Sequence, residues 1–263
     1  MPNLPEEIET RADLTVFYVL DTSGSMVNEK IATLNAAMVE TVEALKDAAK
    51  HNGDAHIRIA ILEFNSGCNW VTYNGPEYME DFTYTDLKAG GLTDMGMALE
   101  ELDKKLHRSE YLNAVVGSKL PIIIFMTDGY ATDDYRKGLE KIKQNKWFKY
   151  ATKIGFAIGE EPDSKMLAEI VGNSEAVIKT DDLDLFSRLL KFVTVTSSKL
   201  QSQTKNDMKD IVTGEDIIHQ AEEEGMITKE DVADDVVPDS EPEESAKNDS
   251  EDEDSAWDFD DWE

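Results

Sequence analysis

The chain has 263 residues and a formal net charge of −30 at pH 7, which is extreme for its length. Such a charge argues against a nucleic acid or an anionic membrane bound through a basic patch, and it favours solubility and cationic partners. The single cysteine, Cys68, excludes an intrachain disulfide and fits a reducing compartment, so we expect a cytoplasmic protein.

The first residues have neither the basic start nor the apolar core of a signal peptide. The longest apolar run, residues 121–126, is far too short to cross a bilayer. We therefore expect no association with a membrane.

A run of β-branched and aromatic residues, 16–20, ends abruptly at Asp21 and predicts a buried strand. Asp21, Ser23 and Ser25 then follow a D-x-S-x-S spacing, which places one carboxylate and two hydroxyls on a single tight turn. Hard oxygen donors of this kind suit Mg²⁺, Mn²⁺ or Ca²⁺. Taken alone, however, the same residues are also ordinary turn formers and helix caps.

The next segments alternate between helix and strand patterns. Residues 30–50 carry apolar side chains at three- and four-residue steps, which predicts an amphipathic helix. Residues 55–64 place isoleucines at alternate positions and predict a strand. A possible edge strand, 69–73, and a long polar connection, 74–89, follow.

Two further loops resemble the first in chemistry. Gly90 and Gly91 precede Thr93, which indicates a constrained loop before a second helix. Residues 120–126 predict another buried strand, and it too ends near an acid, Asp128. Because ligands bind at the carboxyl ends of parallel strands, we expect these loops to lie at one edge of the sheet.

The remaining pattern continues the alternation, with helices from Asp133 to Ile142, 164–171 and 182–200, and strands 150–158 and 176–178. Alternation from residue 13 to about 202 predicts a doubly wound α/β domain. Its sheet should be mainly parallel, with helices on both faces.

The composition changes after residue 202. We expect a domain over 1–202, a linker with one or two short helices over 203–233, and an acidic, disordered tail over 234–263. In the tail Lys247 is the only basic residue, and residues 257–263 interleave aromatic rings with acids. We favour a short docking motif there, with a purely solubilising tail as the alternative.

Three loops together resemble the metal-ion-dependent adhesion site (MIDAS) of von Willebrand factor A domains. They are Asp21-x-Ser23-x-Ser25, Thr93-x-x-Gly96 and Asp128-Gly129. Within that superfamily, residues 19–26, 90–99 and 126–134 resemble the TerY-like proteins of the tellurium-resistance branch. Leu92 departs from the pattern, because many relatives have Gly-Gly-Thr without an intervening residue.

The resemblance implies specific roles. Ser23, Ser25 and Thr93 would ligate Mg²⁺, with Mn²⁺ or Ca²⁺ as alternatives, through neutral hydroxyls. Asp21 and Asp128 would act largely through water and would orient the serines. A partner protein would fill the open position with an Asp or Glu carboxylate. The resemblance also implies a stress-response system that includes a kinase and a phosphatase, and no catalysis by this chain.

Two other functions compete with this one. A strand that ends in an aspartate followed by Thr-Ser could indicate a metal-dependent phosphatase of the haloacid dehalogenase type. Ser23, however, stands where that chemistry needs a second aspartate, and no nucleotide-binding or nucleophile-elbow motif is present. Alternatively, the acidic tail could be the docking element, with the metal secondary.

Overall fold

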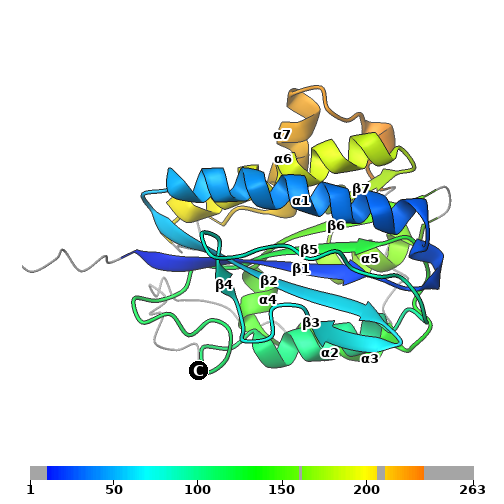
Figure 1. Cartoon of the computed structure of the whole chain (residues 1–263), viewed down its shortest axis with the longest axis horizontal. Helices are drawn as coiled ribbons and strands as arrows, with labels where there is room; N and C mark the ends of the chain where they lie inside the picture. Colours follow the sequence, from blue (N-terminus) through cyan, green and yellow to red (C-terminus); the bar gives the residue numbers. More distant parts are fainter. Residues whose placement is uncertain (1–10, 160–161, 206–210, 234–263) are drawn as a thin grey trace, which may run out of the picture.

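A computed structural model describes residues 11–159, 162–205 and 211–233. Its centre is one seven-stranded sheet with the order β3-β2-β1-β5-β6-β7, and β4 lies beside β2 (Figure 1). The strands are β1 (Ala12–Asp21), β2 (Ala55–Asn65), β3 (Gly67–Trp70), β4 (Glu77–Tyr78), β5 (Ile122–Thr127), β6 (Thr152–Ile158) and β7 (Val177–Thr180). The helices are α1 (Glu29–Lys50), α2 (Met95–Lys105), α3 (Tyr135–Ile142), α4 (Lys146–Tyr150), α5 (Ser164–Val171), α6 (Leu183–Gln203) and α7 (Gly214–Glu223).

Five neighbouring strands run parallel to one another, namely β2, β1, β5, β6 and β7. The short strands β3 and β4 pair antiparallel to β2. β1 lies between β2 and β5, with Val16 opposite both Ile59 and Ile122. Because these central strands run in the same direction, their carboxyl ends meet at one edge, to which the arrows point in Figure 1.

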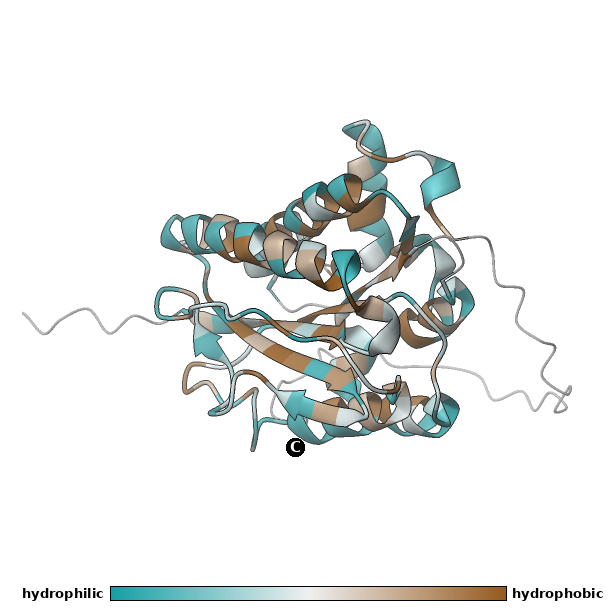
Figure 2. Ribbon diagram, turned by 45° about the vertical axis from the view of Figure 1, so that its right-hand side comes forward, coloured by the Kyte–Doolittle hydropathy of each residue, from teal (hydrophilic) through white to brown (hydrophobic). Residues whose placement is uncertain are grey.

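Alternate residues of β1 belong to two separate hydrophobic cores. Val16 and Tyr18 pack under α1 and α6, whereas Phe17 and Val19 pack under α2 and its neighbours on the other face. Every residue from Leu14 to Asp21 is buried, as expected for a strand covered on both faces. Figure 2 shows the same layering, with hydrophobic strands between helices whose outer faces are hydrophilic.

The predicted fold class is confirmed, and the predicted elements between residues 12 and 203 are present with shifts of a few residues at their ends. Two short elements, α4 and β4, were not predicted from the sequence. α4 is a five-residue helix, too short to show a period, and the Asn145 side chain caps it by accepting from the backbone of Trp147 and Phe148. β4 has only two residues.

Residues 211–233 pack on the sheet and on α6. Ile217, Ile218 and Ala221 of α7 are buried in the same core as α1 and α6. Val232 forms an antiparallel bridge with Ile178, and the Ala233 N–H donates to the Val177 carbonyl at 2.9 Å. Since the expected linker contains this packed helix, we propose that the folded unit extends to about residue 233.

The predicted acidic tail, 234–263, lies outside the described residues. Within the ranges that are described, no helix combines the length and apolar character needed to cross a membrane.

Candidate metal centre

Three loops meet at the carboxyl edge of the sheet, and backbone hydrogen bonds hold two of them together. The Gly24 N–H donates to the Gly91 carbonyl at 3.0 Å, and the Gly90 N–H donates to the Thr22 carbonyl at 2.8 Å. Gly91 adopts a φ of +90°, and a Cβ there would lie 2.7 Å from Ser66 Oγ. Glycine therefore lets the threonine loop approach the turn between β2 and β3.

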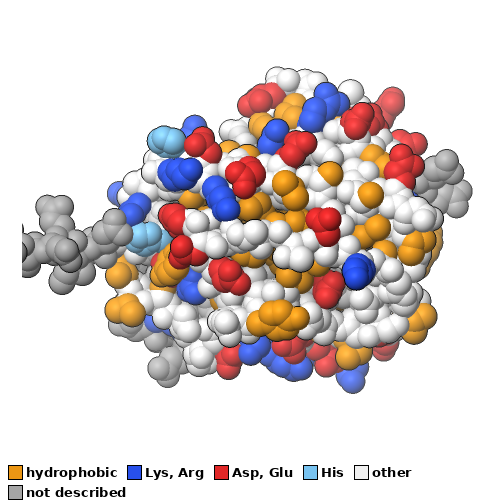
Figure 3. Space-filling model, in the orientation of Figure 1, with side chains coloured by type: hydrophobic (Ala, Val, Ile, Leu, Met, Phe, Trp, Pro, Cys, Tyr) orange, Lys and Arg blue, Asp and Glu red, His pale blue; other side chains and the backbone are white. Residues whose placement is uncertain are grey.

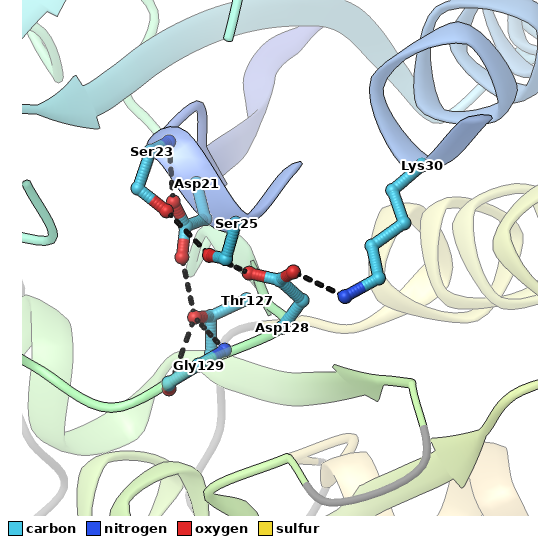
Figure 4. Close-up of polar contacts among 7 residues, drawn as sticks. All are labelled: Asp21, Ser23, Ser25, Lys30, Thr127, Asp128 and Gly129. Carbon is cyan, nitrogen blue, oxygen red and sulfur yellow. Dashed lines mark hydrogen bonds and ion pairs between the residues drawn. The ribbon is translucent and has the colours of Figure 1, made fainter. Parts of the chain in front are cut away.

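Asp21, the last residue of β1, is fully buried between these loops (Figure 4). Its Oδ1 accepts the Ser23 N–H at 2.7 Å, and its Oδ2 accepts the Thr127 hydroxyl at 2.6 Å. Burial raises the pKa of Asp21, and hydrogen bonds from Ser23 and Thr127 oppose that rise. The carboxylate therefore fixes the serine turn against β5 and also leaves negative charge in a desolvated place.

The two serines connect to the loop that follows β5. Ser23 Oγ and Ser25 Oγ lie 3.0 Å apart, and the Ser25 hydroxyl donates to Asp128 Oδ1 at 2.6 Å. Since Ser25 gives its only proton to Asp128, Ser23 must donate to Ser25. Asp128 thereby orients the serine hydroxyls, whose remaining lone pairs are available to a cation. Ser25 is exposed whereas Ser23 and the Asp128 side chain are buried, so solvent reaches the row at Ser25.

Thr93 comes to the same edge by a different route. Its backbone N–H donates to Thr132 Oγ1 at 2.9 Å, and its carbonyl accepts the Thr132 N–H at 2.8 Å. In the part of the chain that is described, the Thr93 hydroxyl makes no hydrogen bond to the other four predicted residues. The structure thus joins Asp21, Ser23, Ser25 and Asp128 directly. It ties Thr93 by its backbone to Thr132, in the loop that follows β5.

Sequence reasoning missed Lys30 on α1. Its Nζ lies 2.5 Å from Asp128 Oδ2, and the Asp128 side chain is completely buried (Figure 4). In the sequence Lys30 looks like any polar residue at the start of an amphipathic helix. Its position five residues after Ser25 is the only local signal that could have drawn attention to it.

Asp133 also has a role that the sequence analysis assigned differently. It was expected to begin the helix that follows β5, but its carboxylate instead accepts the N–H groups of Gly96 and Met97 at 2.9 and 3.0 Å. It therefore caps the first turn of α2 from another loop. A Cβ at Gly96 would lie 2.8 Å from Asp133 Oδ2, which explains the glycine three residues after Thr93.

A cavity of about 580 Å³ adjoins Lys30 and Asp128. Ile158 and Leu183 give it apolar walls, whereas Glu29 and Asp181 add acidic groups. The site therefore has a polar row of hydroxyls on one side of Asp128 and a partly apolar hollow on the other.

The donor set fits a hard divalent cation. Two carboxylates balance its charge, and three hydroxyls supply neutral oxygen ligands. No group of three or more His, Cys, Asp or Glu side chains gathers as a potential metal site among the described residues. A site here would consequently depend on serine and threonine oxygens rather than on imidazole or thiolate.

The fold and the loops define a doubly wound α/β domain with an oxygen-donor site at the carboxyl edge of its sheet. Compared with known protein families, the chain matches the von Willebrand factor type A domain over residues 15–192, and it belongs to that family. Domains of this family typically act as protein-interaction modules.

Solved structures with the same fold are distant in sequence. Proximal thread matrix protein 1 from the mussel byssus aligns with a TM-score of 0.51 and 18% identity, over 72% of this chain and 48% of its own. A von Willebrand factor type A protein from Catenulispora acidiphila aligns with a TM-score of 0.50 and 19% identity, over 71% of this chain and 43% of its own. The PilB minor pilin from Streptococcus sanguinis aligns with a TM-score of 0.52 and 12% identity, over 73% of this chain and 62% of its own.

This chain therefore spans less than two thirds of each of these structures, and at such identities the likeness concerns the fold alone. Among curated protein sequences, none matches the chain significantly.

Proposed function

We propose that the chain is a non-catalytic, Mg²⁺-dependent protein-interaction module. Ser23, Ser25 and Thr93 bind the cation through their hydroxyls, with Mn²⁺ or Ca²⁺ as possible substitutes for Mg²⁺. Asp21 and Asp128 balance its charge and orient the serines. The carboxylate of an Asp or Glu residue in a partner protein completes the coordination.

The observation that carries this proposal is the hydrogen-bonded row from Ser23 through Ser25 to Asp128. The Ser25 hydroxyl donates to Asp128 Oδ1, with 2.6 Å between the two oxygens, so only its lone pairs are available to a cation. Neutral ligands leave the cation more of its charge than a cage of carboxylates would. The cation therefore retains affinity for one further anionic oxygen from outside.

A phosphatase function has less support. Its nucleophile would be Asp21, but this carboxylate is fully buried, and both of its oxygens already accept hydrogen bonds. Cys68 is no better candidate for a nucleophile, because burial raises the pKa of its thiol to about 11.

The resemblance to TerY-like proteins supports a narrower hypothesis. In it, the module acts in the cytoplasm within a tellurite or general stress response, beside a protein kinase and a protein phosphatase. Identification of the partner that is captured in the presence of Mg²⁺ tests this hypothesis.

The decisive experiment compares Mn²⁺ binding by calorimetry in the wild type, Ser25→Ala and the control Ser109→Ala, an exposed serine that follows α2. We expect Ser25→Ala to weaken Mn²⁺ binding at least about tenfold, as losses of ligand or supporting groups typically do. The control should bind as the wild type does. Capture of the partner should require Mg²⁺ and fail with Ser25→Ala. Equal Mn²⁺ affinity in all three proteins would reject the site.

A further inference from the structure

Each loop of the candidate metal centre exposes one large apolar side chain beside a predicted ligand. Val27 follows Ser25 by two residues, Leu92 precedes Thr93, and Tyr130 follows Asp128 by two residues. Their side chains are 43%, 56% and 65% exposed. We call these three residues the apolar rim. Figure 3 shows hydrophobic side chains among charged ones along the edge to which β1 and β2 point in Figure 1.

An apolar rim around a cation favours a ligand with two chemical characters. A carboxylate satisfies the metal, whereas rings or aliphatic groups next to it cover the rim. The cavity beside Asp128 extends the apolar surface through Ile158 and Leu183. Its acids, Glu29, Asp128 and Asp181, outnumber Lys30, so the carboxylate of a ligand would bind the cation and its apolar groups would enter the cavity. The best-matched ligand is therefore a peptide in which acids alternate with aromatic residues.

This chain contains such a peptide. Residues 257–263 read Trp-Asp-Phe-Asp-Asp-Trp-Glu, and they lie outside the described residues. We propose that residues 257–263 bind the metal centre of their own chain, with one carboxylate on the cation and the aromatic rings on the apolar rim. This proposal rests on the proposed metal-dependent function and deepens it, because an external partner must then displace an internal ligand.

The strand register places the start of the tail near the site. Val19, Phe125, Gly155 and Val177 are in register across β1, β5, β6 and β7. Asp21 lies two residues beyond Val19 along β1, so Ala233, which is hydrogen-bonded to Val177, lies about two residues, or ~7 Å, short of Asp21 along the strand direction. Across the sheet, Ala233 lies four strand spacings, or ~19 Å, from β1. The span to be bridged is on the order of 20 Å.

The chain available for this span has a matching length. The roughly 24 residues between Ala233 and Trp257 have a root-mean-square end-to-end distance of about 27 Å if they behave as a flexible coil. A tether whose average length matches the span gives an effective concentration in the millimolar range. A weak site is therefore enough for substantial occupancy.

Electrostatic repulsion opposes the docking, because the domain is acidic as well as the tail. Such repulsion between exposed charges is screened beyond about 8 Å at physiological ionic strength. The bond between the carboxylate and the cation acts at contact distance, so screening weakens it far less. Added salt should therefore leave the docked state in place.

The test uses the full chain labelled with 5-fluorotryptophan. It has four tryptophans, and replacing each in turn by phenylalanine assigns the fluorine resonances. Paramagnetic Mn²⁺ broadens nearby nuclei steeply with distance. We expect substoichiometric Mn²⁺ to broaden the resonances of Trp257 and Trp262 at least severalfold more than that of Trp147, which is buried under the opposite face of the sheet from α1.

Three variants separate the possible causes. Ser25→Ala should abolish the broadening. The double variant Leu92→Ser/Tyr130→Ser should reduce it severalfold and should lower the Mn²⁺ affinity measured by calorimetry by no more than that factor, because docking of the tail and binding of the cation are linked. Val39→Ser, at an apolar residue of α1 that is 45% exposed, is the control and should have no effect.

The remaining outcomes overturn the proposal in distinguishable ways. If calorimetry detects Mn²⁺ at the site but the Trp257 and Trp262 resonances stay sharp, the tail does not dock, and the proposed function stands. If Mn²⁺ broadens the Trp257 and Trp262 resonances of the Ser25→Ala variant as much as those of the wild type, the acidic tail binds Mn²⁺ by itself. Broadening that grows with protein concentration means that the ligand comes from a second copy. Absence of any Mn²⁺ binding removes the proposed function as well.

Discussion

At the scale of single residues, burial and hydrogen bonding have opposite effects on the Asp21 carboxylate. Burial raises its pKa, since a charged carboxylate without water is unfavourable, yet its two oxygens hold the Ser23 N–H and the Thr127 hydroxyl in place. A bound cation would balance the buried negative charge, and the two hydrogen bonds would hold the carboxylate in the position that the cation needs. We therefore expect the Asp21 carboxylate to contribute more to metal binding than to folding.

We predict that Asp21→Ala removes detectable Mn²⁺ binding but leaves the fold intact. The loss of two hydrogen bonds should cost about 1–3 kcal/mol of unfolding free energy, and the removal of a buried charge should offset part of that cost. Calorimetry and circular dichroism measure the two effects, with Asp54→Ala, an exposed acid, as the control. Retained Mn²⁺ affinity would show that Asp21 has no part in the site.

Lys30 is the second residue with a measurable role. Its ammonium neutralises Asp128 in the absence of a metal, and it would repel a cation bound nearby. We predict that Lys30→Met raises Mn²⁺ affinity severalfold and lowers the stability of the metal-free protein, because Asp128 then loses its counter-ion.

Lys46→Met, farther along α1, is the control for this prediction, because Lys46 pairs with Glu43 rather than with the site. Weaker Mn²⁺ binding by Lys30→Met would contradict a competition between Lys30 and the cation for Asp128. Lys30 would then be a residue that positions Asp128.

At the scale of elements, α7 is held against the sheet by a close backbone approach. A Cβ at Gly214, its first residue, would lie 2.0 Å from the Lys153 carbonyl oxygen of β6. No side chain fits there without displacement of the helix. The glycine therefore fixes how residues 211–233 pack.

We predict that Gly214→Ala displaces α7 and costs about 1–3 kcal/mol of unfolding free energy, the usual range for overpacking. Hydrogen exchange should increase in α7 and near Val232, while β1 and β5 stay protected. Gly53→Ala is the matched control, since a Cβ there meets nothing within 4 Å. Unchanged exchange in α7 would mean that this contact does not hold the helix.

At the scale of the whole molecule, the two cores enclose one sheet, and α7 adds Ile217 and Ala221 to the core that α1 and α6 cover. The bridge between Val232 and Ile178 extends this packing almost to the last described residue. We therefore propose that the folded unit is larger than the domain over 1–202 that the composition suggested.

Limited proteolysis tests this boundary. We expect a stable fragment that ends near residue 233, because cleavage requires backbone that can leave its packed environment. Mass spectrometry of the fragment gives its end. A fragment that ends near residue 202 would restore the original boundary and would show that α7 detaches easily.

Local patterns in the sequence determined most of the fold. Buried strands such as 16–20 and 122–126 are continuous apolar runs that end at polar turn residues, so their sequence predicted them without any alternation. Helices such as α1 repeat apolar residues at three- and four-residue steps, so their period predicted them. The parallel topology then predicted that the loops after these strands share an edge. Four of the five candidate ligands are indeed hydrogen-bonded there, whereas their binding of a metal stays a prediction.

Other features depended on contacts between distant segments. Lys30 meets Asp128 across 98 positions of the chain, and Asp133 reaches back 37 positions to cap α2 at Gly96. Gly214 is a turn-forming residue in the sequence, and only the nearness of the Lys153 carbonyl shows why it must be glycine. Periodicity reports which face of an element is buried, but it carries no information on which polar side chain meets which. Those pairings were decided by the packing of the helices on the sheet.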